Sequence, residues 1–538
     1  MSESSTTSAD ADETTHGSAN KWLALAAMMF AVSMMFIDQT IVSIAIPTIQ
    51  TELGLSEAGV QWVINGYLLS LSAFFALGGR LSDILGHKRM VLLGVTIFAV
   101  SSALCGATPD NSLAEIWLIV FRVIQGIGAA LLFPAALAIV VSTFPLKERG
   151  KALALFFGIT GGLTAIGPIM GGYLSEWTWR AIFWVNVPVA IIAIILTLLA
   201  KIHTQHKREP LDYKGAVLIA AGMTFSVLGL QQASTWGWTD PRTIGSIVLG
   251  LILLAIFIKV ETRVKVPLIK VDIFKDRAFF VDNAVLFFAM MAFVPVFFFA
   301  SVYAQAVLGY NATNAGLYLL VFFAGFAPAV QVGGRILDKS GARVPVIVGC
   351  AVGAVGFFLW SQKLTDYSLS AQWPYIVIAA AGIGLLLGPA STDAVNRAIN
   401  ASYGEVTGIN QTIRNYGSSL GLAIFGTLLI NANSSKIADT LTSFGVPESQ
   451  SSTMARSIAD GSDQGSDQLA SNLPESVQQQ LASAIQLDFA QANQVVFYGM
   501  SAALVVAFVV ALFHPGGRVT EEVRDPNESG PVTTATAE

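Results

Sequence analysis

Fourteen long apolar segments are the feature that most constrains the fold of this 538-residue chain. A helix that crosses the hydrocarbon core of a bilayer needs about 20 mainly apolar residues, and charged residues make up only 12% of the sequence. That share is about half of what a soluble domain carries. We therefore expect an all-α integral membrane protein, neither a soluble enzyme nor a nucleic-acid-binding protein. The expected spans are 22–47, 59–79, 90–107, 114–137, 152–174, 181–200, 214–232, 243–260, 278–304, 314–336, 345–361, 373–392, 406–430 and 495–513.

The basic residues between these segments predict the orientation of the chain in the membrane. If the N-terminus is cytoplasmic, 23 of the 30 Lys and Arg residues lie on the cytoplasmic side, five lie outside and two lie within spans. Positively charged loops face the cytoplasm in most membrane proteins. We therefore expect a multi-pass protein of the cell membrane with both termini in the cytoplasm. We expect the source to be a bacterium. Residues 1–20 and 516–538 are expected to be disordered cytoplasmic tails.

An internal repeat indicates two related halves. The segment Gly78-Gly79-Arg80-Leu81-Ser82-Asp83 with Gly86 matches Gly333-Gly334-Arg335-Ile336-Leu337-Asp338 with Gly341, at an offset of 255 residues. Eight spans separate the two copies, which predicts six helices, two inserted helices and six further helices. Repeated bundles are the usual build of secondary transporters. The expected units are an N-terminal six-helix bundle at 21–200, the inserted pair with its linkers at 201–277, and a C-terminal six-helix bundle at 278–515.

The longest polar segment, residues 431–494, is expected on the outer side of the membrane. Beyond Pro474, Val477, Leu481, Ile485 and Phe489 recur every four residues, as one face of a helix would. We expect an amphipathic helix that lies on the outer surface before the last span; a flexible linker is the alternative.

Charged residues within spans are candidates for function because burying a charge in lipid is costly. Asp38 and Arg122 come out at similar depth in the outer half of the membrane when helix rise is counted from the span ends. A carboxylate that pairs with an arginine in one state and loses it in another can carry a proton. A static ion pair that locks two helices is the structural alternative. Gln125 shares the helix face of Arg122.

Four motifs give the chain a specific resemblance. Gly79-x-Leu81-x-Asp83-x-x-Gly86-His87-Lys88-Arg89 resembles motif A of the major facilitator superfamily, and the segment around Arg122 resembles motif B. The run Gly167-Pro168-x-x-Gly171-Gly172 resembles motif C, the antiporter motif, although its first glycine is displaced to Gly162. Residues 37–47 resemble motif D1 of the drug:proton antiporters with fourteen transmembrane helices, with Ser43 where that family often has Asn.

The resemblance, which covers roughly residues 20–515, implies the major facilitator fold and a proton-driven exporter of the QacA/EmrB type. It assigns proton coupling to Asp38 and Arg122. It assigns gating between inward-open and outward-open states to the motif A residues and their second copy. The antiporter motif is expected to form a hinge or seal in the outer half of the membrane. The gating residues are Gly79, Asp83, Gly86, Arg89 and Asp338, and the antiporter residues are Gly162, Gly167, Pro168, Gly171 and Gly172.

The substrate is less constrained by the sequence. Met and Phe residues in the spans suit bulky apolar ligands, and the polar residues within spans make Asp38, Gln125, Gln305, Asn410 and Arg414 candidates for substrate binding. A lone acid favours lipophilic cations, whereas Arg414 equally suits an anion. We expect efflux of drugs or hydrophobic metabolites by a monomer. The alternative is one narrow substrate, such as an amino acid, sugar, siderophore or lipid.

Enzymatic chemistry and cofactors are not expected. The chain has no phosphate-binding G-x-x-x-x-G-K-[ST] motif, so ATP-driven export is disfavoured. All five histidines (His16, His87, His203, His206 and His514) lie outside the expected spans, and the two cysteines, Cys105 and Cys350, lie inside them. We therefore expect no metal site and no disulfide.

Overall fold

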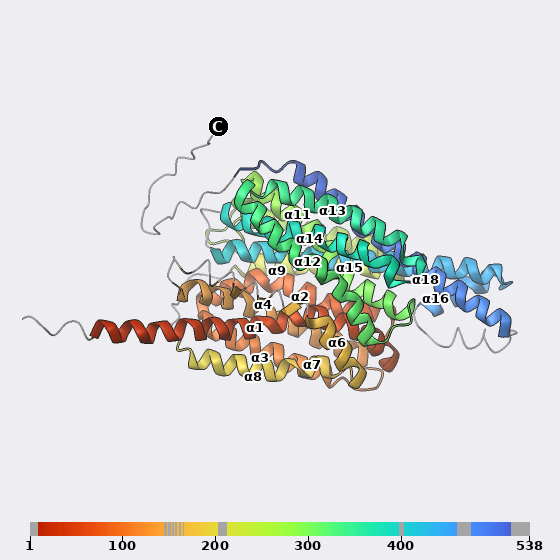
Figure 1. The fold of residues 1–538 in the computed structure, drawn as a ribbon, viewed down its shortest axis with the longest axis horizontal. Coiled ribbons are helices and arrows are strands. Elements are labelled where there is room, and N and C mark those ends of the chain that lie inside the picture. The colour runs from red at the N-terminus through yellow and green to blue at the C-terminus, as the bar shows by residue number, and fades with distance from the viewer. Residues whose placement is uncertain are drawn as a thin grey trace, which may run out of the picture.

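The computed structural model describes residues 9–144, 148, 152, 155–156, 159–160, 163–164, 166–202, 212–397, 403–459 and 475–517. Regular structure in these residues is helical throughout, which confirms the all-α prediction. The longer helices run side by side in an elongated bundle (Figure 1). The α-helices of the described residues are α1 (Ala9–Leu53), α2 (Glu57–Leu85), α3 (His87–Gly106), α4 (Ala114–Thr143), α6 (Ile166–Trp177), α7 (Ala181–Trp184), α8 (Asn186–Leu199), α9 (Tyr213–Trp236), α10 (Pro241–Glu261), α11 (Arg277–Ala306), α12 (Ala312–Ser340), α13 (Arg343–Gln362), α14 (Leu369–Arg397), α15 (Tyr403–Ser443), α16 (Glu448–Ala459) and α18 (Glu475–Leu512). Short 3₁₀ turns lie at Val271–Lys275 and Leu364–Asp366.

Twelve membrane-length apolar helices match twelve of the expected spans. The thirteenth expected span, 406–430, lies within α15, a 41-residue helix that is less apolar because it carries several polar residues. The fifth, 152–174, is only partly within the described residues and leads into α6. The sequence pattern therefore placed the helices well, because an apolar run of this length has few other ways to satisfy its backbone.

The two ends of the bundle differ. The first span begins at Lys21 and the last ends at Leu512 on the same side, which we call the terminal end (left in Figure 1). At the opposite side, the distal end, α15, α16 and α18 extend beyond the other helices. Large apolar side chains such as Ile191, Ile195 and Leu251 are about half exposed on the flanks, as expected for a surface that faces lipid.

The internal repeat extends to the helices themselves. α2 and α12 begin and end at positions 255 residues apart, and their N-caps are also equivalent. Ser56 accepts a hydrogen bond from the N–H of Gly59, and Asn311 accepts one from the N–H of Asn314. α9 and α10 follow the first set of helices and precede the second. This order gives the major facilitator arrangement with two inserted helices.

Glycines bring equivalent helices into close contact in both halves. A Cβ built on Gly94 of α3 would lie 2.8 Å from the carbonyl oxygen of Gly128 in α4. In the second half, a Cβ built on Gly349 of α13 would lie 2.7 Å from the carbonyl oxygen of Gly382 in α14. Small residues allow helix backbones to pack at such short range in membranes. The repeat therefore preserves the helix spacing as well as the motif.

The inserted pair packs on the outside of the two bundles through α9. Ser226 of α9 lies 2.7 Å from the Tyr416 hydroxyl of α15. The Thr427 hydroxyl of α15 donates to the carbonyl of Leu230, also in α9, at 2.8 Å. α10 packs mainly on α9, and its apolar residues are largely exposed. The inserted helices therefore add to the rim of the bundle and leave the interface between its halves intact.

The predicted helix at 477–489 is present, but its placement was wrong. These residues are the first part of α18, which continues without a break to Leu512, so they do not form a separate helix on the membrane surface. Their apolar face packs against the far end of α15 and against α16, where Ile437, Leu441, Ala455 and Leu481 form a small core. A four-residue period identifies an apolar face, but not what covers that face.

Disordered tails were expected at residues 1–20 and 516–538, and the structure describes part of each. α1 begins at Ala9, so residues 9–20, for which the sequence predicted disorder, are part of that helix. Residues 518–538 lie outside the described residues, whereas Gly516 and Gly517 are ordered against α14, as shown below.

The turns between repeated helices give a first prediction. Gly86 and Gly341 have φ values of +94° and +81°, with extended ψ angles, a region essentially restricted to glycine. We expect Gly86→Ala and Gly341→Ala each to lower the free energy of unfolding by about 1–3 kcal/mol. Thermal unfolding of the purified protein in detergent would measure this. Gly334→Ala is the matched control, because a Cβ at this helical position meets open space; equal unfolding temperatures for all three variants would contradict the argument.

Candidate functional site

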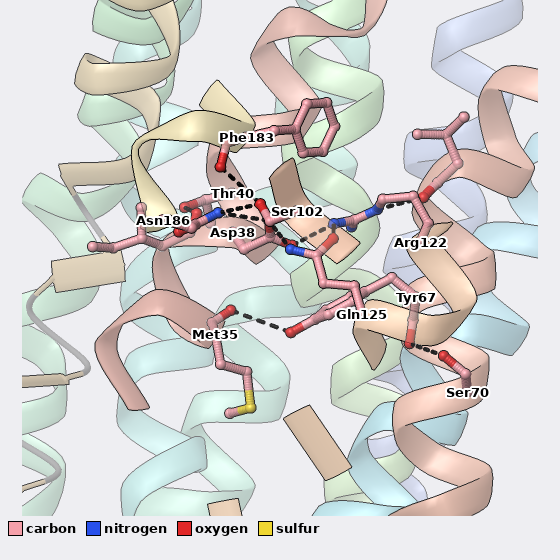
Figure 2. A network of polar contacts seen from close by, with 12 residues as sticks. Met35, Asp38, Thr40, Tyr67, Ser70, Ser102, Arg122, Gln125, Phe183 and Asn186 are labelled. Carbon is pink, nitrogen blue, oxygen red and sulfur yellow. Dashed lines mark hydrogen bonds and ion pairs between the residues drawn. The ribbon is translucent and has the colours of Figure 1, made fainter. Parts of the chain in front are cut away.

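The site is centred on two charges buried in the N-terminal half. Asp38 lies midway along α1 and is fully buried, and Arg122 of α4 is 1% exposed. The Arg122 Nη1 lies 2.5 Å from the Asp38 Oδ2. The structure thus brings together the two residues that matched depth predicted. Figure 2 shows how Arg122 and Gln125 approach Asp38 from the same side.

Neighbouring groups hold both charges in place. Gln125 donates from Nε2 to Asp38 Oδ1 at 3.0 Å and accepts from Arg122 Nη1 at 2.7 Å. The Arg122 Nε donates to the carbonyl of Val63 in α2 at 2.9 Å. The ring of Tyr67 lies 4.4 Å from the guanidinium carbon of Arg122, a cation–π contact. Three helices, α1, α2 and α4, are therefore joined through one guanidinium group.

A further polar group reaches Asp38 from α8 and was missed by the sequence analysis. The Asn186 Nδ2 donates to Asp38 Oδ1 at 3.5 Å and to the Ser102 hydroxyl of α3 at 3.0 Å. Ser102 in turn donates to the carbonyl of Phe183 at 2.8 Å (Figure 2). An asparagine at the start of an apolar span was the available signal. With it, the network extends across six helical segments of the same bundle, α1, α2, α3, α4, α7 and α8.

The buried ion pair of Asp38 and Arg122 depends on the groups that hydrogen-bond to it. Removing two charges from water costs several kcal/mol per ion, and the cost is offset only when the geometry and the remaining hydrogen bonds are good. Both oxygens of Asp38 are occupied here by donors from Arg122, Gln125 and Asn186. A change that removes the guanidinium would leave a buried carboxylate with neutral donors only, which favours uptake of a proton.

The predicted gating residues lie at the terminal end, around the turns after α2 and α12. Asp83 is in the last turn of α2. Gly86 forms the turn itself, and Arg89 is exposed in the first turn of α3. Asp338 is exposed in the last turn of α12. A Cβ at Gly79 would lie 3.7 Å from Pro134 of α4, an ordinary contact.

The antiporter motif packs α6 against both halves. A Cβ on Gly171 would lie 2.8 Å from the carbonyl oxygen of Ile41 in α1, and one on Gly172 would lie 2.7 Å from the Cα of Thr313 in α12. A Cβ on Gly167 would overlap the hydroxyl of Thr40. Pro168 is buried within α6, and Gly162 lies outside the described residues. The glycines therefore allow the two bundles to meet closely at the distal side.

The remaining candidates for substrate binding are spread over the C-terminal half. Gln305 of α11 donates to the carbonyl of Ile44 in α1 at 2.9 Å, which makes it a contact between the two halves. Asn410 of α15 donates to Asn283 of α11 at 3.4 Å. Arg414 of α15 has its Nη2 3.9 Å from the sulfur of Met290, and its buried Nε has no hydrogen-bond partner among the described residues. Of these three candidates, Arg414 is the one with a buried donor that has no partner among the described residues.

One cluster of ionisable side chains was not anticipated. Asp282 of α11, Asp393 of α14 and His514 after α18 are all buried, and one potential ligand atom from each lies within 4.8 Å of the others. The sequence placed His514 outside the expected spans, and neither acid was among the predicted site residues. Their separation along the chain gave no signal that they meet.

Comparison with known proteins identifies the family. The model of the Major Facilitator Superfamily matches residues 28–422, and a relative from Streptomyces glaucescens is 31% identical over 94% of both chains. The chain belongs to the Major Facilitator Superfamily. It is thus a multi-pass membrane transporter of small molecules, from a family of transporters and not of enzymes.

Named relatives of this major facilitator are resistance and export proteins. The Streptomyces glaucescens relative is the "Tetracenomycin C resistance and export protein". "Multidrug resistance protein 3" of Bacillus subtilis is 27% identical over 94% of this chain and 98% of its own length. The "Cephamycin export protein CmcT" of Amycolatopsis lactamdurans is 32% identical over 76% of this chain and 85% of its own length.

Solved structures show the same fold at lower identity. A bacterial homologue of the lysosomal transporter Spinster, in an inward-facing conformation, matches 92% of this major facilitator and 98% of its own chain, with a TM-score of 0.58 and 19% identity. A peptide transporter of the POT family matches 94% of this chain and 99% of its own, with a TM-score of 0.61 and 14% identity. These matches support the fold of the transporter alone.

The buried pair gives a second prediction. Arg122→Gln leaves a buried carboxylate without its cation, so we expect a loss of about 3–5 kcal/mol in the free energy of unfolding. Asp38→Asn combined with Arg122→Gln leaves no uncompensated charge, so the double variant should be more stable than Arg122→Gln alone. Thermal unfolding in detergent would compare them. Lys363→Gln, which removes the half-exposed ion pair with Asp366, is the control and should lower the free energy of unfolding by less than about 1 kcal/mol. If the losses caused by Asp38→Asn and by Arg122→Gln simply add in the double variant, the two residues are not coupled.

Proposed function

We propose that this major facilitator is a proton-coupled efflux transporter of lipophilic small molecules that works by alternating access. The observation that carries the proposal is the buried Asp38–Arg122 pair, which is held by neutral donors on both sides. Export as the direction of transport is supported by relatives that are named resistance and export proteins. The motif C glycines at the distal contact between halves support the same direction.

The orientation follows from charge. With the terminal end in the cytoplasm, 23 of the 30 basic residues lie on that side, as the positive-inside rule requires. The distal contacts between α1, α6, α11 and α12 would then close the outer side of the transporter. Substrate would reach the space between the bundles from the cytoplasm in this state.

Proton coupling would work through competition at Asp38. In the state described here, Arg122 neutralises the carboxylate, so a proton at Asp38 would place an uncompensated positive charge in the bundle. When rearrangement of α4 against α1 draws the guanidinium away, the buried carboxylate favours a proton instead. Binding of the proton and loss of the ion pair are thus linked to one movement, which is the requirement for exchange of a proton for a substrate.

The coupling role gives a third prediction. Asp38→Asn cannot exchange a proton, so export of a fluorescent substrate from inverted vesicles should lose its dependence on an imposed pH gradient. Exchange of labelled for unlabelled substrate without a gradient should remain, because alternating access itself needs no proton at this position.

Asp366→Asn is the matched control, because it makes the same chemical change at an exposed distal pair and should leave gradient-driven export at the wild-type rate. If Asp38→Asn retains gradient-driven export, the coupling site lies elsewhere.

The chemistry of the C-terminal half favours substrates with an anionic or strongly accepting group. Both oxygens of Asp38 are occupied, so it offers no free carboxylate to a cationic drug. Arg414 has no acidic partner among the ion pairs of the described residues, and its guanidinium faces Met290. An unpaired buried cation is costly, and a ligand carboxylate or carbonyl would relieve that cost with charge-assisted hydrogen bonds.

Aromatic side chains of α11, α12 and α15 suit the apolar part of such a substrate. The ring of Phe287 lies 6.1 Å from that of Tyr416, two residues beyond Arg414. Further along α11, Phe293 stacks on Phe326 of α12 at 5.2 Å. Flat aromatic faces and a flexible Met accommodate several ring systems. One narrow substrate remains the alternative, and it would use the same Arg414 donors.

The substrate class gives a fourth prediction. Arg414→Gln removes the cation, so the KM for lipophilic anions should rise about tenfold or more, the value of one charged hydrogen bond. Transport of a size-matched lipophilic cation should be unchanged or faster. Arg414→Lys keeps the charge but loses the planar guanidinium with its paired donors. Its KM for lipophilic anions should therefore lie between those of wild type and Arg414→Gln. Equal losses for anions and cations in Arg414→Gln would rule out charge recognition, and transport of a single metabolite from a broad panel would favour the narrow alternative.

A further inference from the structure

A second set of buried charges lies at the terminal end of the C-terminal half. It joins Asp282 of α11, Asp393 and Arg397 of α14, and His514 of the segment that follows α18. Asp282 is 0% exposed, His514 1% and Asp393 3%. This cluster belongs to the opposite half from Asp38, and none of its members contacts the first site.

The cluster fastens residues 513–517 to two helices. Nε2 of His514 lies 3.2 Å from Asp393 Oδ2 and 3.3 Å from Asp282 Oδ1. Arg397 donates from Nε to Asp393 Oδ2 at 2.5 Å, and from Nη2 to the carbonyls of Gly516 and Gly517 at 2.9 and 3.2 Å. The C-terminal segment is therefore held by an imidazole on one side and a guanidinium on the other.

The charges of the cluster do not balance without one more cation. Two carboxylates face one guanidinium and one imidazole, whose Nε2–H is directed to Asp393. Neither oxygen of Asp282 has a hydrogen-bond partner among the described residues. Nearby Arg343 of α13 lies beside Gly516, with its Cδ 3.4 Å from a Cβ built there. A buried, unsatisfied carboxylate of this kind binds either a proton or a metal ion.

The imidazole decides between these two. A histidine that binds a metal through Nε2 normally carries a hydrogen on Nδ1 and donates it. Here Nδ1 of His514 faces the backbone N–H of Gly516 at 3.0 Å, so it donates to no acceptor among the described residues. In addition, Arg397 already occupies the Asp393 oxygen that faces the histidine. Both features disfavour a metal ion and leave the proton.

We propose that Asp282, Asp393 and His514 form a second proton-binding site, which holds one shared proton and thereby fastens the C-terminal segment to α11 and α14. With that proton the two carboxylates, the imidazole and Arg397 have no net charge; without it they carry one buried negative charge. The proton belongs to the cluster as a whole. The site goes beyond the coupling role of Asp38, since it links the proton to the attachment of the C-terminus.

The direction of the pH dependence follows from His514, which lies outside the spans. Burial lowers the pKa of His514, but the nearby carboxylates of Asp282 and Asp393 outweigh burial and raise the pKa from 6.5 to about 9. A group with a raised pKa stabilises the folded state fully below its unfolded value and loses that contribution as pH rises through its folded value. The stabilisation from the cluster should therefore be complete below about pH 6.5 and lost through about pH 9.

The test measures the unfolding temperature of the purified full-length protein in detergent from neutral to alkaline pH, so it needs no substrate. We expect wild type to lose several °C through about pH 9. Asp282→Asn imitates the protonated carboxyl, so it should keep its neutral-pH unfolding temperature across this range. Asp38→Asn should retain the wild-type transition, which separates this proposal from proton coupling at the first site.

Asp272→Asn is the matched control, because this carboxylate at the same end of the bundle is exposed and pairs only with Lys275; it should follow wild type. If Asp282→Asn does not fold, His514→Gln serves instead and should move the transition to lower pH. Identical profiles for wild type and the cluster variants would overturn the proposal. So would one bound zinc or manganese ion per wild-type molecule that is absent from Asp282→Asn.

Discussion

The ion pair between Asp38 and Arg122 sets the geometry of the N-terminal half. In an interior with few charges, a guanidinium that joins α1, α2 and α4 must find all of its partners in the same bundle, and it does so through Val63, Gln125 and Tyr67. The desolvation cost of both groups is recovered only while these contacts hold. A movement of α4 against α1 would therefore change the charge state that Asp38 favours, which is the link that the proposed proton-driven cycle requires.

Close backbone packing lets such a movement occur between rigid units. Glycines hold α3 against α4 and α13 against α14 at equivalent positions, and the antiporter glycines bring α6 against both α1 and α12. The first set and the contacts of α6 with α1 lie within bundles, whereas the contact of Gly172 with α12 lies between them. Because packed helices have few intermediate arrangements, the distal contact is either made or lost as a unit. The same residue type thus serves stability within halves and exchange between them.

Sequence reasoning succeeded where one residue or one run carries the information. Apolar length predicted the spans, and counting along each helix predicted that Asp38 and Arg122 would lie at one depth. It failed where the outcome depends on contacts between distant segments. His514 was expected outside the spans and in no site, yet it lies buried between acids more than 100 residues away. Likewise, a period of four residues could not tell a surface helix from the first part of α18.

The two halves have the same helix arrangement but differ in the chemistry of their side chains. At the offset that aligns α2 with α12, the position equivalent to Asp38 is Phe293, and the position equivalent to Arg122 is Val377. Phe293 lies in a cluster of rings with Phe297, Phe322 and Phe326. An apolar cluster there cannot hold a proton, but under the proposed function it would offer an apolar surface to a substrate. Proton exchange in one half and substrate binding in the other would be coupled because both sites adjoin the same moving interface, so neither ligand needs to contact the other.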